Sequence, residues 1–165
     1  MMPRGLSWPN LTEGQTFQSP ARTITESDVV SFAGMTGDYN PMHVNREFAE
    51  NSAFGERIAH GLLGLSIAHG LMLGSGLLGD NAIAFLGLSE WNFRAPIRLG
   101  DTIHADFEIV ELRQRTSHPD QGIVTFSVRV LNQHGELTQS GRKAILMRTA
   151  NTDPSRAMPK PNAIE

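Results

Sequence analysis

The segment 58–78 constrains the fold more than any other part of the chain, because it is rich in leucine and contains no Asp, Glu, Lys or Arg. A helix that is apolar on all sides has to be enclosed, either by lipid or by the rest of the protein. The segment is close to the ~20 residues that span a bilayer. Its frequent glycines, together with His60 and His69, favour a buried core helix, so we expect no membrane partner.

The sequence that follows changes to a two-residue period. Alternating apolar and polar residues predict four strands, at 83–93, 102–110, 122–131 and 137–147. The short connections between the last three strands predict an antiparallel meander. A single sheet can bury the helix expected over 60–78 by curling around it. We therefore predict an α+β fold with the helix on one face of the sheet.

Shorter elements are predicted before this helix. Residues 16–24 have the composition of a first strand, interrupted once by proline. Thr25 is a suitable helix N-cap and Asp28 stands three residues later, so a short helix is expected to begin here with a variant capping box. Residues 45–51 predict a further helical turn, with Phe48 as its apolar anchor.

One domain with two flanking segments accounts for the length. A chain of 165 residues is long enough for a single core. Residues 1–15 are polar and contain Pro and Gly, so we expect an N-terminal arm. The predicted elements all lie within 16–149. Residues 150–165 contain three prolines and are expected to form a disordered tail.

Composition argues against several classes of partner and chemistry. The formal net charge is −3, and Lys and Arg are scattered, so we expect no nucleic-acid partner. The chain has no cysteine, which excludes disulfides and thiolate chemistry and fits a reducing cytoplasm. Residues 1–5 lack the apolar run of a secretory signal, so we expect a cytoplasmic protein.

The segment 37–43, with the sequence Gly-Asp-Tyr-Asn-Pro-Met-His, places a carboxylate and an imidazole five residues apart. Pro41 fixes its own φ and pushes Asn40 toward extended conformations, so we predict a loop and not a helix. Asn40 and Pro41 would shape this loop, Asn40 through hydrogen bonds to the local backbone. Asp38 and His43 can then converge and hold a water between them, which indicates acid–base chemistry.

These residues and those that follow resemble the MaoC-like family, which includes the R-specific enoyl-CoA hydratases. The resemblance rests on Phe32-Ala33 with 37–43, on Phe54 with 58–61 (Ile-Ala-His-Gly), and on the segments 91–96 and 100–102. It covers residues 16–149. It implies a hot dog fold, which is a curved antiparallel sheet wrapped around one long helix, and it implies no cofactor.

Carried over residue by residue, the resemblance makes Asp38 and His43 the catalytic pair of a hydro-lyase. The reaction would be the reversible hydration of trans-2-enoyl-CoA to R-3-hydroxyacyl-CoA. It needs a base to take a proton from water and an acid to protonate Cα, and one water held by both side chains serves both needs. Gly61, at the predicted helix N-terminus, would offer a backbone N–H to the thioester oxygen as negative charge grows there.

Four further residues are assigned to the pocket or to substrate binding. His60 is expected to make a structural hydrogen bond at the start of the helix. His69 stands where some family hydratases carry a serine that helps to position the site, so the polarity of the pocket is an open question. Arg94 and Arg98 could lie near the phosphates of an acyl-CoA partner.

Several alternatives stay open on the sequence alone. Asp38, His43 and His60 have the donor types of a two-His-one-carboxylate metal site, but a compact spacing such as His-x-x-x-His is missing, so no metal is expected. A hot dog thioesterase would hydrolyse the same class of thioester with a carboxylate. A non-catalytic module that binds acyl thioesters is a further alternative to the hydro-lyase.

Sheet edges bear on assembly. A single hot dog sheet leaves its edge strands unpaired, and an exposed edge invites aggregation. Pairing two such edges across a two-fold axis removes the exposed edge. The resemblance therefore implies a homodimer, with each pocket close to the interface.

Overall fold

The computed structural model describes residues 7–149 and is built around one antiparallel sheet of six strands. The strand order is β1–β4–β5–β6–β3, with β2 paired to β4 outside this path. The strands are β1 (Thr16–Gln18), β2 (Arg22–Thr23), β3 (Ala82–Phe93), β4 (Thr102–Gln114), β5 (Gln121–Leu131) and β6 (Leu137–Arg148). The helices are α1 (Glu26–Thr36), α2 (Pro41–Val44), α3 (Arg46–Glu50) and α4 (Gly61–Gly74), with 3₁₀ turns η1 (Trp8–Asn10) and η2 (Gly79–Asn81).

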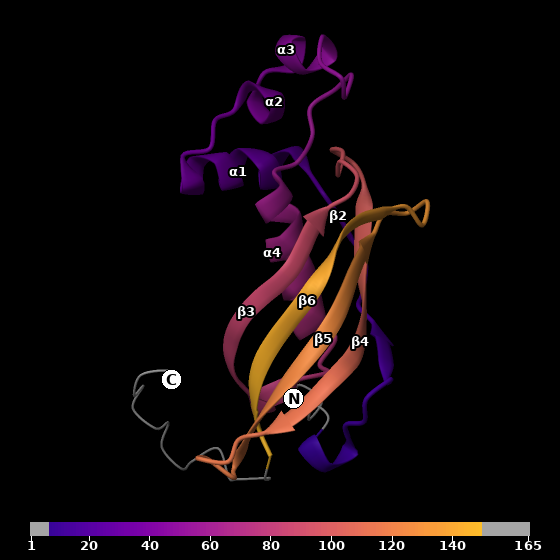
Figure 1. Cartoon of the computed structure of the whole chain (residues 1–165). Helices are drawn as coiled ribbons and strands as arrows, with labels where there is room; N and C mark the ends of the chain where they lie inside the picture. Colours follow the sequence, from indigo (N-terminus) through magenta and orange to yellow (C-terminus); the bar gives the residue numbers. More distant parts are fainter. Residues whose placement is uncertain (1–6, 150–165) are drawn as a thin grey trace.

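The helix α4 lies along one face of the sheet, while α1, α2 and α3 gather beyond the end where α4 begins (Figure 1). This is the predicted α+β arrangement, which is confirmed. The predicted meander is present as β4, β5 and β6, and β3 pairs with β6, so β3 forms one edge of the sheet. The strand predicted over 102–110 continues to Gln114, because a bulge between Ile109 and Glu111 lets pairing with β5 resume.

The core forms between α4 and the alternate residues of the long strands that face it. Ile103, Ala105, Phe107 and Ile109 of β4 are at most 2% exposed. They pack in one cluster with the inner residues of α4, which are Leu63, Ile67, Ala68 and Met72. Each fully buried large side chain contributes roughly 1.5–3 kcal/mol. This packing fixes where the first residue of α4 stands relative to the sheet.

The extent of α4 differs from the prediction at its C-terminal end. The helix begins at Gly61 but ends at Gly74 rather than at residue 78. Ser75 donates its side-chain hydroxyl to a carbonyl of the last turn, and Gly76 turns the chain with a φ of 74°. Within residues 7–149, no helix is long and apolar enough to cross a membrane.

The short helices α1 and α3 form where their local signals predicted them. Thr25 and Asp28 form the predicted capping box, in which each side chain accepts from the other's backbone N–H. The helical turn predicted near 45–51 is present as α3. Phe48 is 50% exposed, so the prediction that it is the apolar anchor of this turn was wrong. The neighbouring Ala49 is fully buried instead, because consecutive helical residues point in different directions.

The two ends of the chain are described to different extents. The tail expected over 150–165 lies outside the described residues. Of residues 1–15, only 7–15 are described, and there Leu11 is buried in the core. The Trp8 ring covers Gly122 on β5 so closely that a Cβ at position 122 would lie 2.3 Å from it.

Candidate active site

The connection between α1 and α3 positions Asp38 and His43. Asn40 Oδ1 accepts a hydrogen bond from the Met42 N–H at 3.0 Å and so caps the single turn of α2. The prediction that the whole segment 37–43 is non-helical was therefore wrong, and His43 lies in a helical turn. Proline fits this turn because it occupies the first helical position, where no N–H is needed and its φ is suitable.

The His43 ring is half-buried and its orientation is fixed by one backbone contact. Nδ1 lies 2.8 Å from the Ile58 carbonyl oxygen. A carbonyl can only accept, so Nδ1 carries the proton and donates it. In the neutral ring the lone pair is then at Nε2. His43 is thereby prepared to accept a proton at Nε2, the nitrogen that is free of this contact.

His60 is buried at 2% exposure and contacts both members of the expected pair. Its Nε2 donates to the Asp38 backbone carbonyl at 3.0 Å, which is the kind of structural hydrogen bond predicted for it. Its ring centroid lies 3.8 Å from that of His43 and 5.0 Å from that of Phe32. His60 Nδ1 is buried without a hydrogen-bond partner among residues 7–149. The ring therefore supports the backbone at Asp38 and packs against the ring of His43.

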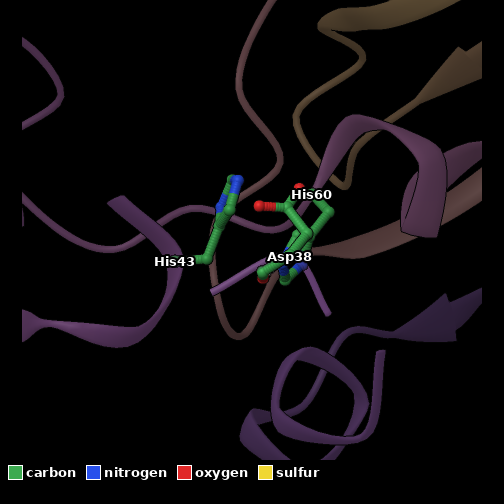
Figure 2. Close-up of side chains that lie close together, drawn as sticks. All are labelled: Asp38, His43 and His60. Atoms are coloured by element: carbon green, nitrogen blue, oxygen red, sulfur yellow. Dashed lines mark hydrogen bonds between the residues drawn. The ribbon is translucent and has the colours of Figure 1, made fainter. Parts of the chain in front are cut away.

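The three side chains form one cluster (Figure 2). A carboxylate oxygen of Asp38 and one ring nitrogen from each of His43 and His60 lie within 4.8 Å of one another. Asp38 is exposed, His43 is half-buried and His60 is buried, so the cluster extends from solvent into the protein. These are also donor types that a transition metal accepts. A chelator control is therefore needed in any assay of this site.

An ion pair ties the segment that carries His60 to α1. Arg57 donates to both carboxylate oxygens of Glu26, each at 2.7 Å. The hydrogen bond and the charge of Arg57 lower the pKa of the Glu26 carboxyl, and the same pair raises the pKa of Arg57. Bidentate pairing of this kind fixes geometry as well as adding energy. It holds the approach to α4 against the helix that precedes Asp38.

Gly61 is the first residue of α4, and its backbone N–H has no acceptor among residues 7–149. The unpaired N–H groups at a helix N-terminus favour negative charge. A Cβ at this position would lie 2.7 Å from Cε1 of Phe93, so only glycine fits without displacing that ring. Gln139, on β6, donates from Nε2 to the Gly61 carbonyl at 2.9 Å and accepts from the Trp91 indole N–H.

A pocket of about 620 Å³ opens beside Gly61. Its lining includes His43, Gly61, Phe93, Arg94, Ile97 and Gln139. Arg94, one of the two arginines suggested by the sequence, is exposed at this pocket. Arg98 is not in the lining, since its guanidinium pairs with Glu56 and donates to the Phe54 carbonyl. The structure thus brings His43, Gly61 and Arg94 to one pocket and leaves Arg98 beside it.

His69 lies two turns along α4 from Gly61, outside this pocket. Its Nδ1 contacts Nζ of Lys143 on β6. Burial, followed by the charge of Lys143, lowers the pKa of His69, and burial lowers the pKa of Lys143 to about 8. The sequence reasoning did not single out Lys143 or Gln139. Strand periodicity could have found Lys143, because it shares the buried face of β6 with Ile145 and Met147.

Comparison with known sequences identifies the family of this chain. Residues 9–131 match the family described as MaoC like domain. The chain belongs to this MaoC-like family. It is 40% identical to an (R)-specific enoyl-CoA hydratase of Rhodospirillum rubrum over 117 residues, which are 71% of this chain and 75% of the relative. It is 35% identical to the Aeromonas caviae (R)-specific enoyl-CoA hydratase over 119 residues, covering 72% and 83% of the two chains.

Solved structures agree with this MaoC-like assignment. The MaoC-like dehydratase from Rhodospirillum rubrum superposes with a TM-score of 0.81 at 30% identity, covering 90% of this chain and all of that one. The (R)-hydratase from A. caviae involved in PHA biosynthesis gives 0.70 at 32% identity, covering 82% and 96%. A double hot dog protein of Mycobacterium tuberculosis, 19% identical, gives 0.79 over 97% of this chain and 53% of its own. The expected hot dog fold is confirmed.

Proposed function

We propose that this MaoC-like protein is a hydro-lyase that reversibly adds water to trans-2-enoyl-CoA and forms the R-3-hydroxyacyl-CoA. One observation carries the proposal. Asp38 and His43 present a carboxylate oxygen and a ring nitrogen within 4.8 Å of each other, next to a pocket lined by Gly61, whose N–H has no acceptor among residues 7–149. The R outcome and the CoA thioester are taken from the activities named for the R. rubrum and A. caviae relatives.

A single water between Asp38 and His43 would carry the chemistry. Two hydrogen bonds of about 2.8 Å each span a separation of this size through one water. In the hydration direction, the water oxygen bonds to C3 and one water proton passes to the pair. The pair returns a proton to C2, so the net change is one water added across the double bond. His43 Nε2 suits the accepting role because Nδ1–H is engaged with Ile58.

The N-terminus of α4 would stabilise the charge that develops on the substrate. Protonation at C2 follows an enolate-like state with negative charge on the thioester oxygen. The Gly61 N–H, unpaired at the start of a helix whose dipole favours anions, lies where such an oxygen could be bound. The Phe93 ring against Gly61 keeps this position apolar. Such an environment strengthens the hydrogen bond to the oxygen.

Activity assays on crotonyl-CoA test the proposal. A hydratase consumes the conjugated double bond with no release of free thiol. A thioesterase releases free CoA instead, and a binding module does neither. Formation of the R-3-hydroxybutyryl-CoA, resolved on a chiral column, is the expected result. Thiol release without hydration, or no turnover by folded protein, would refute the assignment.

A homodimer is part of the same proposal. β3 is an edge strand of the sheet and carries Phe85, Leu88 and Phe93, which are 51%, 38% and 55% exposed. Pairing this edge with a second copy would cover these apolar side chains and satisfy the edge backbone groups. Light scattering at micromolar concentration tests the homodimer. A single mass of 18.1 kDa, which is the mass of one chain, would refute it. The absence of cysteine is compatible with the cytoplasmic location that we propose.

A further inference from the structure

Lys143 is a buried cation with no anion beside it. Its side chain is on β6 and is 3% exposed, and Nζ lies 3.5 Å from the Met72 sulfur and 5.4 Å from the centroid of the Phe85 ring. Within residues 7–149, no carboxylate is within ion-pair distance of it. An unpaired charge is costly to bury. With a pKa of about 8, the amine is nevertheless mostly protonated at pH 7.

His69 adds a second donor at the same place. The Lys143 ammonium has only protons to offer, so it donates to Nδ1 of His69. The neutral imidazole then carries its own proton at Nε2. No acceptor for this Nε2–H is found in the part of the chain that the structure describes, and His69 is half-exposed. Among residues 7–149, Lys143 and His69 together therefore present a positive charge with no carboxylate beside it and a His69 N–H with no protein acceptor.

This donor pair lies on the same two elements as the active-site pocket. Gln139 on β6 contacts Gly61 on α4 at the pocket, and Lys143 contacts His69 farther along the same strand and helix. Gln139 and Lys143 are four positions apart on the strand, which is about 13 Å. Gly61 and His69 are eight positions apart on the helix, which is about 12 Å. The two spacings match, so the donor pair stands about 12 Å from the Gly61 N–H along the line where α4 meets β6.

We propose that Lys143 and His69 bind a carboxylate at the far end of the acyl chain, so that the preferred substrates are trans-2-enoyl-CoA esters of linear dicarboxylic acids. This inference rests on the proposed hydratase function. A carboxylate accepts from an ammonium and an imidazole N–H at once. The thioester oxygen at Gly61 fixes one end of the substrate and the donor pair fixes the other. The site therefore selects for length as well as for charge.

Kinetics on matched substrates test this inference. The first series consists of trans-2-enoyl-CoA thioesters of increasing chain length that end in a free carboxylate. The second series consists of trans-2-enoyl-CoA thioesters of the same lengths that end in a methyl group. With the wild-type protein, kcat/KM for the carboxylated series should peak at one length and exceed its counterpart by roughly tenfold or more. In Lys143→Met, the ratio of kcat/KM for the carboxylated substrate to kcat/KM for its methyl-terminated counterpart should fall by a similar factor.

Arg142→Met is the matched control, because Arg142 is the neighbouring residue on β6 but points outward and faces Glu90. It should leave the ratio unchanged. If Lys143→Met does not fold, the wild-type comparison decides alone. A wild-type preference for methyl-terminated substrates, or a ratio that Lys143→Met leaves unchanged, would overturn the inference while the hydratase assignment stands. If neither series is hydrated, the proposed function fails and this inference fails with it.

Discussion

Replacing Gly61 with alanine perturbs the proposed oxyanion position directly. The added Cβ would lie 2.7 Å from Cε1 and 2.9 Å from Cδ1 of Phe93. Ordinary contact between carbon atoms begins near 3.5 Å, so the Phe93 ring or the start of α4 has to shift by roughly 1 Å. A shift of that size in a positioning element costs on the order of 10²-fold in rate. Losing the donor outright costs about 10²–10³-fold.

We therefore expect Gly61→Ala to lower kcat on crotonyl-CoA by about 10²-fold or more, while the protein remains folded by circular dichroism. Gly34→Ala is the matched control, because Gly34 lies inside α1 and its new Cβ would meet only the Tyr39 hydroxyl, at an ordinary 3.8 Å. That control should keep its activity and gain roughly 0.5–1 kcal/mol of stability. Unchanged kcat in Gly61→Ala would refute the role of this N–H.

Three further outcomes are expected. Asp38→Asn and His43→Ala should each lower kcat by at least ~10²-fold. The loss of kcat in the double mutant should be far smaller than the product of the two single losses, because both side chains act on one water. Full activity in either single mutant would contradict the mechanism. Prolonged treatment with a chelator should leave the rate unchanged, and a loss that added metal restores would show that the cluster with His60 holds an ion. Lys143 has a folded-state pKa of about 8 against 10.5 in the unfolded chain, so the unfolded state binds more protons between these values. The difference in free energy of unfolding between the wild type and Lys143→Met, measured by urea titration, should therefore rise in favour of the wild type from pH 8 to 10.5. A difference that does not change with pH would mean that the amine is not buried.

Local signals were enough for much of the fold. Thr25 and Asp28 specify their capping box within four residues of sequence, and strand alternation located the long strands. The end of α4 could not be read from apolarity, because Leu77 and Leu78 are buried without being helical. Their burial depends on packing against the sheet, whereas the helix boundary is set by the hydrogen bonds of Ser75 and the φ of the glycine that follows.

The sequence predicts the candidate site as a set of residues but does not predict their arrangement. A motif can indicate that Asp38 and His43 act together, yet the contact between the His43 and His60 rings depends on how α2 and the start of α4 meet in space. Proline at position 41 suggested a loop, and the outcome was a helical turn, since proline is tolerated at the first helical position. Lys143 was missed because a lysine in a strand is usually assigned to the solvent face.

The candidate catalytic residues and one side of the pocket wall come from different parts of the chain. Asp38, His43 and His60 lie between α1 and the start of α4, and Gly61 is the first residue of α4. Phe93 on β3, the loop 94–97 and Gln139 on β6 line another side of the pocket. Substitutions at these strand and loop positions can therefore reshape the proposed acyl-binding surface without changing the proposed acid–base pair. A gene encoding such a protein can diverge in substrate range by changing a few strand positions while it inherits the reaction intact.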